Sequence, residues 1–238
     1  MRKVLIFFAV FFLILFKAQK ENLSSYNAIS LNYQFNSKYF LFTEVQLRGI
    51  EDFSYPDYYE LKGGIGYNLT KNHKPLIGIG RYVNYTEKSL SKEEFRIFLQ
   101  DVINLNSGIF KFENRFRAEQ SWFYEPKKSA HSKRNRFRYR LNISAPLNSK
   151  KVEKGTISAN IYDEVFFVIP MKPSFARNRF FAGLSYQFNK EISLSSGYLW
   201  QREFGVISNR NFHFLYLAFS INLENLKEKS TQNLNIND

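Results

Sequence analysis

Alternation of charged and apolar side chains at every second residue is the feature that most constrains how this chain can fold. In residues 111–119 every odd position is charged, whereas the even positions are Phe, Asn, Phe and Ala. Residues 134–143 repeat the pattern with four arginines. Successive side chains of a β-strand point to opposite faces of the sheet, so each run has one charged and one mostly apolar face. The pattern predicts strands, and no helical periodicity follows residue 25.

Eleven runs of this kind follow one another along the chain. They span residues 26–35, 38–48, 57–69, 75–85, 93–104, 109–122, 134–146, 155–168, 177–188, 190–203 and 210–223. All six prolines lie between the runs or at their ends, as expected of a residue that cannot donate to a strand ladder. Single-chain bacterial barrels have even strand numbers. We therefore expect about twelve strands, with one more hidden in residues 19–26, and ten strands is the alternative.

The connections between the runs alternate in length. The tight ones are residues 36–37, 71–74, 107–108 and 189, and the long ones are 49–56, 86–92, 123–133, 169–176 and 204–209. The connection at 148–154 is intermediate, at a place where a tight turn is due. Short periplasmic turns that alternate with longer extracellular loops are typical of outer-membrane barrels.

The first residues have the character of a secretory signal peptide. Arg2 and Lys3 precede an apolar run over residues 4–16, which is shorter than the about twenty residues that a membrane-spanning helix needs. An uncleaved membrane anchor is the alternative. The expected domains are a signal peptide at 1–19, a barrel at 20–223 and a polar C-terminal tail at 224–238.

Composition helps to choose between a soluble and a membrane-embedded barrel. Aromatic residues make up 18% of the chain, with 26 Phe and 15 Tyr, yet the mean hydropathy is −0.37. A soluble barrel would bury its aromatic face and expose its arginines, whereas a membrane barrel does the reverse. The signal segment, the strand lengths and the aromatic excess favour an antiparallel transmembrane β-barrel in a bacterial outer membrane. A soluble barrel or sandwich remains the alternative.

Polar residues on one face of neighbouring runs form a charge ladder. It comprises Glu44, Arg48, Glu94, Arg96, Gln100, Glu113, Arg115, Arg117, Glu119, Arg136, Arg138, Arg140, Glu164, Arg177 and Arg179. Sequential strands usually pair, and charges inside a narrow barrel must be paired as well. One interpretation is a narrow, positively biased pore for anions or acidic small solutes, because guanidinium groups match carboxylates bidentately. The other is a salt-bridged plug in a structural or partner-binding barrel.

Other function classes have weaker support. The net charge of +13 would suit nucleic acid, but the arginines alternate within aromatic runs and form no basic helix or tail, so no nucleic-acid partner is expected. The chain has no cysteine, which excludes disulfides and thiolate metal sites. Its three histidines have no metal-ligand spacing, and no G-x-S-x-G elbow is present, so we expect neither a cofactor nor catalysis. A lipid-modifying or hydrolytic enzyme on a barrel is the alternative.

An ordered series of short motifs resembles a known family. The motifs are Glu44-x-x-x-Arg48, Glu94-x-Arg96-x-x-x-Gln100, Arg115-x-Arg117-x-Glu119, Arg136-x-Arg138-x-Arg140, Ala145-Pro146-Leu147, Asp163-Glu164, Asn178-Arg179 and Gly183-Leu184-x-Tyr186. Over residues 26–223 they resemble the outer-membrane β-barrel family called domain of unknown function 2490. The resemblance implies an outer-membrane barrel and supplies no activity. A barrel in that membrane is expected to contact lipid, lipopolysaccharide and the barrel-assembly machinery.

Overall fold

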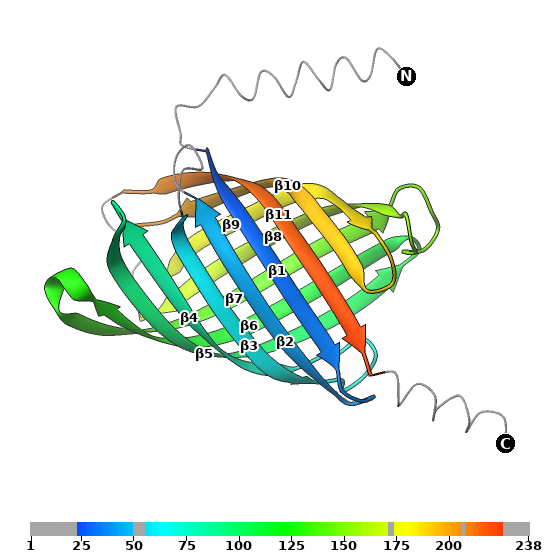
Figure 1. Ribbon diagram of the computed structural model, residues 1–238, viewed down its shortest axis with the longest axis horizontal. Helices are drawn as coiled ribbons and strands as arrows, with labels where there is room; N and C mark the ends of the chain where they lie inside the picture. The colour runs from blue at the N-terminus through cyan, green and yellow to red at the C-terminus, as the bar shows by residue number, and fades with distance from the viewer. Residues whose placement is uncertain (1–22, 50–55, 171–173, 206–207, 226–238) are drawn as a thin grey trace, which may run out of the picture.

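A computed structural model describes residues 23–49, 56–170, 174–205 and 208–225 of the chain, which form one closed barrel of eleven strands (Figure 1). The strands are β1 (Leu23–Gln34), β2 (Tyr39–Gly49), β3 (Pro56–Tyr67), β4 (Leu76–Thr86), β5 (Ser89–Ser107), β6 (Phe110–Glu125), β7 (Ala130–Pro146), β8 (Ile157–Ile169), β9 (Phe175–Gln187), β10 (Ile192–Glu203) and β11 (Arg210–Glu224). A single-turn helix, η2 (Pro126–Lys128), joins β6 to β7. Among the described residues, no helix has the length and the apolar content to cross a membrane. The predicted all-β barrel is confirmed.

The number of strands and the closure of the barrel differ from the sequence prediction of about twelve strands, or ten. Strands adjacent in sequence pair antiparallel, but β1 and β11 run parallel, with Leu23–Gln34 opposite His213–Glu224 (Figure 1). An odd number of up-and-down strands leaves the first and the last pointing the same way, so only a parallel pair can close the barrel. Of the segment expected to hide one more strand, residues 23–26 belong to β1 and residues 19–22 lie outside the described residues.

The predicted alternation of tight and long connections is wrong in several places. β4 passes to β5 through Glu87 and Lys88 alone, where a long loop was expected. The predicted loop at 123–133 is mostly strand, because β6 and β7 continue until only η2 and Ser129 separate them. This hairpin, drawn in green, projects beyond the rest of the wall (Figure 1). The connection at 147–156 is longer than predicted and lies at the opposite end of the barrel.

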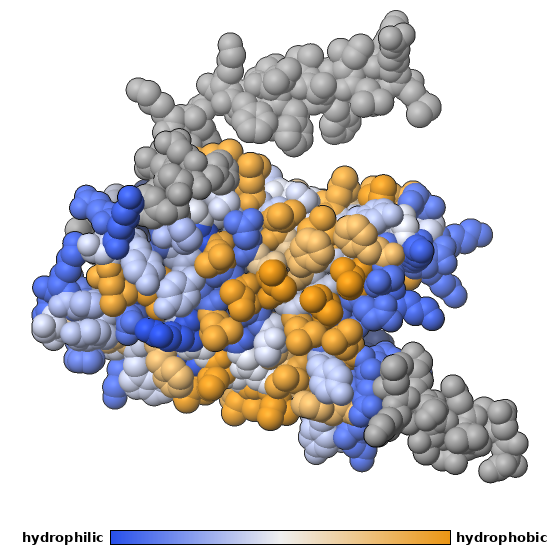
Figure 2. Space-filling view, in the orientation of Figure 1, coloured by the Kyte–Doolittle hydropathy of each residue, from blue (hydrophilic) through white to orange (hydrophobic). Residues whose placement is uncertain are grey.

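The wall places the two faces of the alternating pattern on opposite sides. Large apolar side chains such as Ile29, Leu61 and Leu99 are exposed on the outer surface, whereas Glu119 and Glu164 are buried. Apolar residues gather across the middle of the visible outer face, and hydrophilic residues lie toward both ends (Figure 2). The charged face therefore points into the barrel, which is the reverse of a soluble barrel.

Aromatic rings pack against one another near both ends of the outer wall. Near one end, the rings of Tyr39 and Tyr67 lie 5.2 Å apart, centroid to centroid. Near the other end, Phe95 and Trp122 lie 5.9 Å apart, as neighbours on β5 and β6. Aliphatic residues such as Leu99 lie between these two aromatic rows.

Glycine in β4 makes room for a ring beneath the charged residues. A Cβ atom added to Gly78 would lie 2.3 Å from the ring of Phe98 and 2.7 Å from the carbonyl oxygen of Gly63. The space that a side chain would occupy is thus taken by Phe98, whose ring lies 4.5 Å from the guanidinium carbon of Arg117. The glycine helps to position an arginine on a strand two places away in the wall.

Candidate functional site

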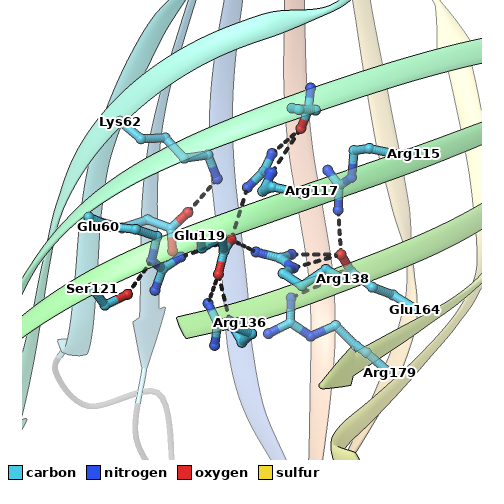
Figure 3. Close-up of polar contacts among 12 residues, drawn as sticks. Glu60, Lys62, Arg115, Arg117, Glu119, Ser121, Arg136, Arg138, Glu164 and Arg179 are labelled. Atoms are coloured by element: carbon cyan, nitrogen blue, oxygen red, sulfur yellow. Dashed lines mark hydrogen bonds and ion pairs between the residues drawn. The ribbon is translucent and has the colours of Figure 1, made fainter. Parts of the chain in front are cut away.

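Two buried glutamates form ion pairs with several arginines of the barrel interior (Figure 3). The first is Glu119 on β6, whose side chain is 0% exposed. Its carboxylate accepts hydrogen bonds from Arg136 at 2.5 Å and from Arg138 at 2.8 Å. Arg96 lies 3.4 Å away and Arg117 3.8 Å away. Four guanidinium groups therefore surround one carboxylate.

The second glutamate, Glu164 on β8, shares one of these arginines. Arg138 donates to the Oε1 atom of Glu164 at 2.7 Å, and Arg115 donates to the same atom at 2.6 Å. Arg179 on β9 lies 3.7 Å from Oε2. Arg138 thus bridges the two carboxylates (Figure 3), and the network extends along the inner face of five neighbouring strands, β5 to β9.

Strand register places Arg136 directly opposite Glu119 and Arg179 directly opposite Glu164, but it gives other arginines no acid opposite them. Across β6 and β7, Arg115 lies opposite Arg140, and Arg117 lies opposite Arg138. Like charges directly opposite each other are destabilising. Each of these arginines therefore extends to an acceptor elsewhere, and Arg115 reaches Glu164 on β8. The ion pairs therefore lie both within the β6–β7 hairpin, as between Arg140 and Glu113, and beyond it, as between Arg115 and Glu164.

Neutral acceptors and aromatic rings accommodate the arginines that the two glutamates do not satisfy fully. Arg117 donates its Nε hydrogen to the amide oxygen of Gln100 at 2.9 Å. Arg179 donates to the amide oxygen of Gln201 through two nitrogens, at 3.0 and 2.7 Å. The guanidinium of Arg96 lies 3.7 Å from the ring centroid of Tyr82, a cation–π distance.

A smaller cluster on β2 and β3 lies beside the network. The ammonium group of Lys62 binds both Glu44 and Glu60. Arg48 has its guanidinium between aromatic rings, 4.2 Å from the centroid of Tyr58 and 4.8 Å from that of Tyr26. Glu44 and Arg48 are four residues apart in the sequence, yet each has partners on other strands.

The remaining ladder residues pair near the two ends of the network. Glu94 binds Arg96 at 2.6 Å, Glu113 binds Arg140, and Arg177 binds Glu203. Several interior polar residues on the same strand faces were not predicted as members of the ladder; these are Glu60, Lys62, Gln201 and Glu203, together with Arg134, which belongs to the alternating run 134–143. Their positions at every second residue in β3, β7 and β10 were the signal that could have found them.

The interactions in this site are ion pairs between buried guanidinium and carboxylate groups. The six arginines that converge on Glu119 and Glu164 have side chains no more than 14% exposed. Ion pairs at such burial are retained only when their hydrogen bonds are well satisfied. Within the described residues, no three acidic or histidine side chains are grouped so that they could hold a metal ion.

Comparison with known proteins identifies the family. A search of curated proteins found no match. The family described as "Protein of unknown function (DUF2490)" matches residues 23–211, which include β1 to β10 and the whole network. The chain belongs to the DUF2490 family.

Proposed function

We propose that this protein is a β-barrel of a bacterial outer membrane, closed to passive diffusion by its arginine–glutamate network, and that it acts as a structural or ligand-binding barrel rather than as an enzyme. The observation that carries the proposal is the inverted polarity of the wall, with apolar side chains outside and buried, paired charges inside. Membrane lipid, lipopolysaccharide and the barrel-assembly machinery are the partners that such a location implies.

The outer surface supports the membrane location. Transmembrane barrels have an apolar band flanked by aromatic girdles at both interfaces. Exposed aliphatic residues of this wall include Ile77 and Leu99. The contacts of Tyr39 with Tyr67 and of Phe95 with Trp122 lie near opposite ends of the wall, on either side of these residues.

The packing of the interior favours a plug over an open pore. Arginines that face a wide water-filled channel would be hydrated, and their pairs would contribute little to stability. Here Glu119 and Glu164 are 0% and 2% exposed and are surrounded by guanidinium groups. This burial and pairing support a closed interior over a water-filled channel.

Conductance in planar bilayers tests the closure. We expect the refolded protein, once its insertion is verified by heat-modifiable migration on a gel, to produce no sustained current. The physical reason is that an ion would have to break buried pairs such as Arg138 with Glu164. Stepwise, anion-selective currents from the inserted protein would contradict the plug and would support the pore.

Single-cysteine labelling tests the location and the orientation together. The native chain has no cysteine, so one introduced thiol is the only reactive one. Ser129 and Ser208 lie in connections at one end of the barrel, and Asn72 and Asn189 lie in connections at the other. We expect S129C and S208C to react with an impermeant maleimide on intact cells, and N72C and N189C to react only after lysis. Equal labelling of all four on intact cells would refute the proposed topology.

A further inference from the structure

A cavity of about 490 Å³ lies inside the barrel above the network, at the end that contains the β10–β11 connection. Its charged lining consists of four arginines and one glutamate; these are Arg134, Arg136, Arg177, Arg210 and Glu203. We call this cavity the arginine cup. Binding sites for small molecules commonly have volumes of about 300–1,000 Å³.

The positive charges of the arginine cup exceed the negative charge available to them. Glu203 is the only carboxylate in the charged lining given above, and it is shared by Arg177 and by Arg210, which lies 3.3 Å away. Arg134 lies as far as 3.8 Å from Glu94, and its side chain is 31% exposed. The surplus guanidinium groups therefore present donors that an anion would satisfy.

Side chains lining the arginine cup are held in position by contacts within the protein, without a ligand. Arg136 is held from below by Glu119, with its Nε atom 2.5 Å from the carboxylate. The ring of Phe166 lies against two of the arginines, 5.4 Å from the guanidinium carbon of Arg136 and 5.3 Å from that of Arg177. Phe204 adds a second aromatic side chain to the lining. A ligand would therefore contact positioned guanidinium groups beside the partly exposed ring of Phe204.

We propose that the arginine cup binds a small soluble organic anion that carries phosphate or carboxylate groups next to an apolar or aromatic body. Guanidinium groups bind such oxyanions bidentately, and the half-buried ring of Phe204 can pack against the rest of the molecule, whereas Phe166 is 1% exposed and supports the arginines from beneath. The ligand is soluble because the lining faces the barrel interior, which membrane lipid outside the wall does not reach. The inference deepens the proposed function by giving the closed barrel a ligand.

Calorimetric titration of the refolded protein in zwitterionic micelles tests the inference, with phenyl phosphate and inorganic phosphate as probes. We expect phenyl phosphate to bind more tightly than inorganic phosphate, since only the former reaches the apolar wall. The double variant R134Q/R177Q should weaken phenyl phosphate binding about tenfold or more, because two charge-assisted contacts are lost. E203Q should strengthen it, because the carboxylate that competes for Arg177 and Arg210 is gone.

The matched control is R81Q, since Arg81 is exposed on the outer wall, where it pairs with Glu93 at 2.7 Å. R81Q should bind phenyl phosphate as the native protein does. Equal weakening by R81Q and R134Q/R177Q, or no heat of binding from folded native protein, would overturn the inference. Conductance of the same preparation separates the two proposals: a conducting barrel that binds phenyl phosphate refutes only the closure, and a silent barrel that does not bind refutes only the ligand.

Discussion

Replacing Glu119 by glutamine is expected to lower the free energy of unfolding by about 3–5 kcal/mol, the usual cost of breaking a buried ion pair by removing one partner. Glutamine matches glutamate in size, so the substitution removes the charge without leaving a cavity. The guanidinium groups of Arg136 and Arg138, 2.5 and 2.8 Å from the native carboxylate, would remain buried without a counter-charge there. Urea titration of the refolded barrel, followed by tryptophan fluorescence, measures the loss.

Glu93 offers the matched control for this substitution. It pairs with Arg81 on the outer side of the wall, and its side chain is 32% exposed. Because exposed ion pairs contribute about 0–1 kcal/mol, E93Q should change the free energy of unfolding by no more than that. A loss equally small for E119Q would mean that water compensates the interior charges. That outcome would count against the plug and in favour of a hydrated pore.

Replacing Leu99 by arginine is expected to destabilise the barrel by about 2–4 kcal/mol in lipid vesicles, which is the cost of a basic residue on the lipid face near the bilayer midplane. Leu99 is 59% exposed on the outer wall, between the two aromatic rows. In water, an arginine at so exposed a position would be tolerated, since surface substitutions usually change stability by less than about 0.5 kcal/mol. Equilibrium unfolding in vesicles measures the difference.

Leu147 is the control for the lipid face, because it is 61% exposed and lies in the connection between β7 and β8 rather than in the wall. L147R should leave the free energy of unfolding nearly unchanged, although Leu147 is about as exposed as Leu99. If both variants are equally stable, exposure alone determines the cost of the charge. The outer surface would then face water, and the membrane location would be refuted.

Much of the fold could be predicted from the sequence, because charged and apolar residues alternate wherever one face of a strand is charged and the other is apolar. Each predicted run overlaps one strand of the barrel. The ends of the strands were harder to predict. Glu87 and Lys88 turn the chain with φ angles of 52° and 62°. Neither residue type predicts a tight turn, as glycine or asparagine would. Polar residues of the β6–β7 hairpin were interpreted as loop, whereas they continue the strands.

Closure was mispredicted for a different reason. The even strand number was predicted because single-chain bacterial barrels have even numbers of strands. No residue of β1 or β11 indicates that these two strands pair in parallel. The ion-pair partners of the interior side chains also could not be predicted from the sequence. The sequence predicts that the ladder charges pair but does not assign an acid to Arg115; Arg140 lies directly opposite Arg115, whose long side chain reaches Glu164 on β8. Side-chain length and register decide the partner, and the period of two reveals only the face.

The parallel seam between β1 and β11 has a consequence for the connectivity of the chain. In an even-stranded barrel both ends emerge on the same side, so a short linker can join them and new ends can be cut in any loop. Here Leu23 and Glu224 lie at opposite ends of the barrel (Figure 1). The twelve residues of β1 extend over roughly 40 Å along the strand at about 3.3 Å per residue. A linker would have to thread the packed interior or run along the outside of the wall, so this topology resists circular permutation.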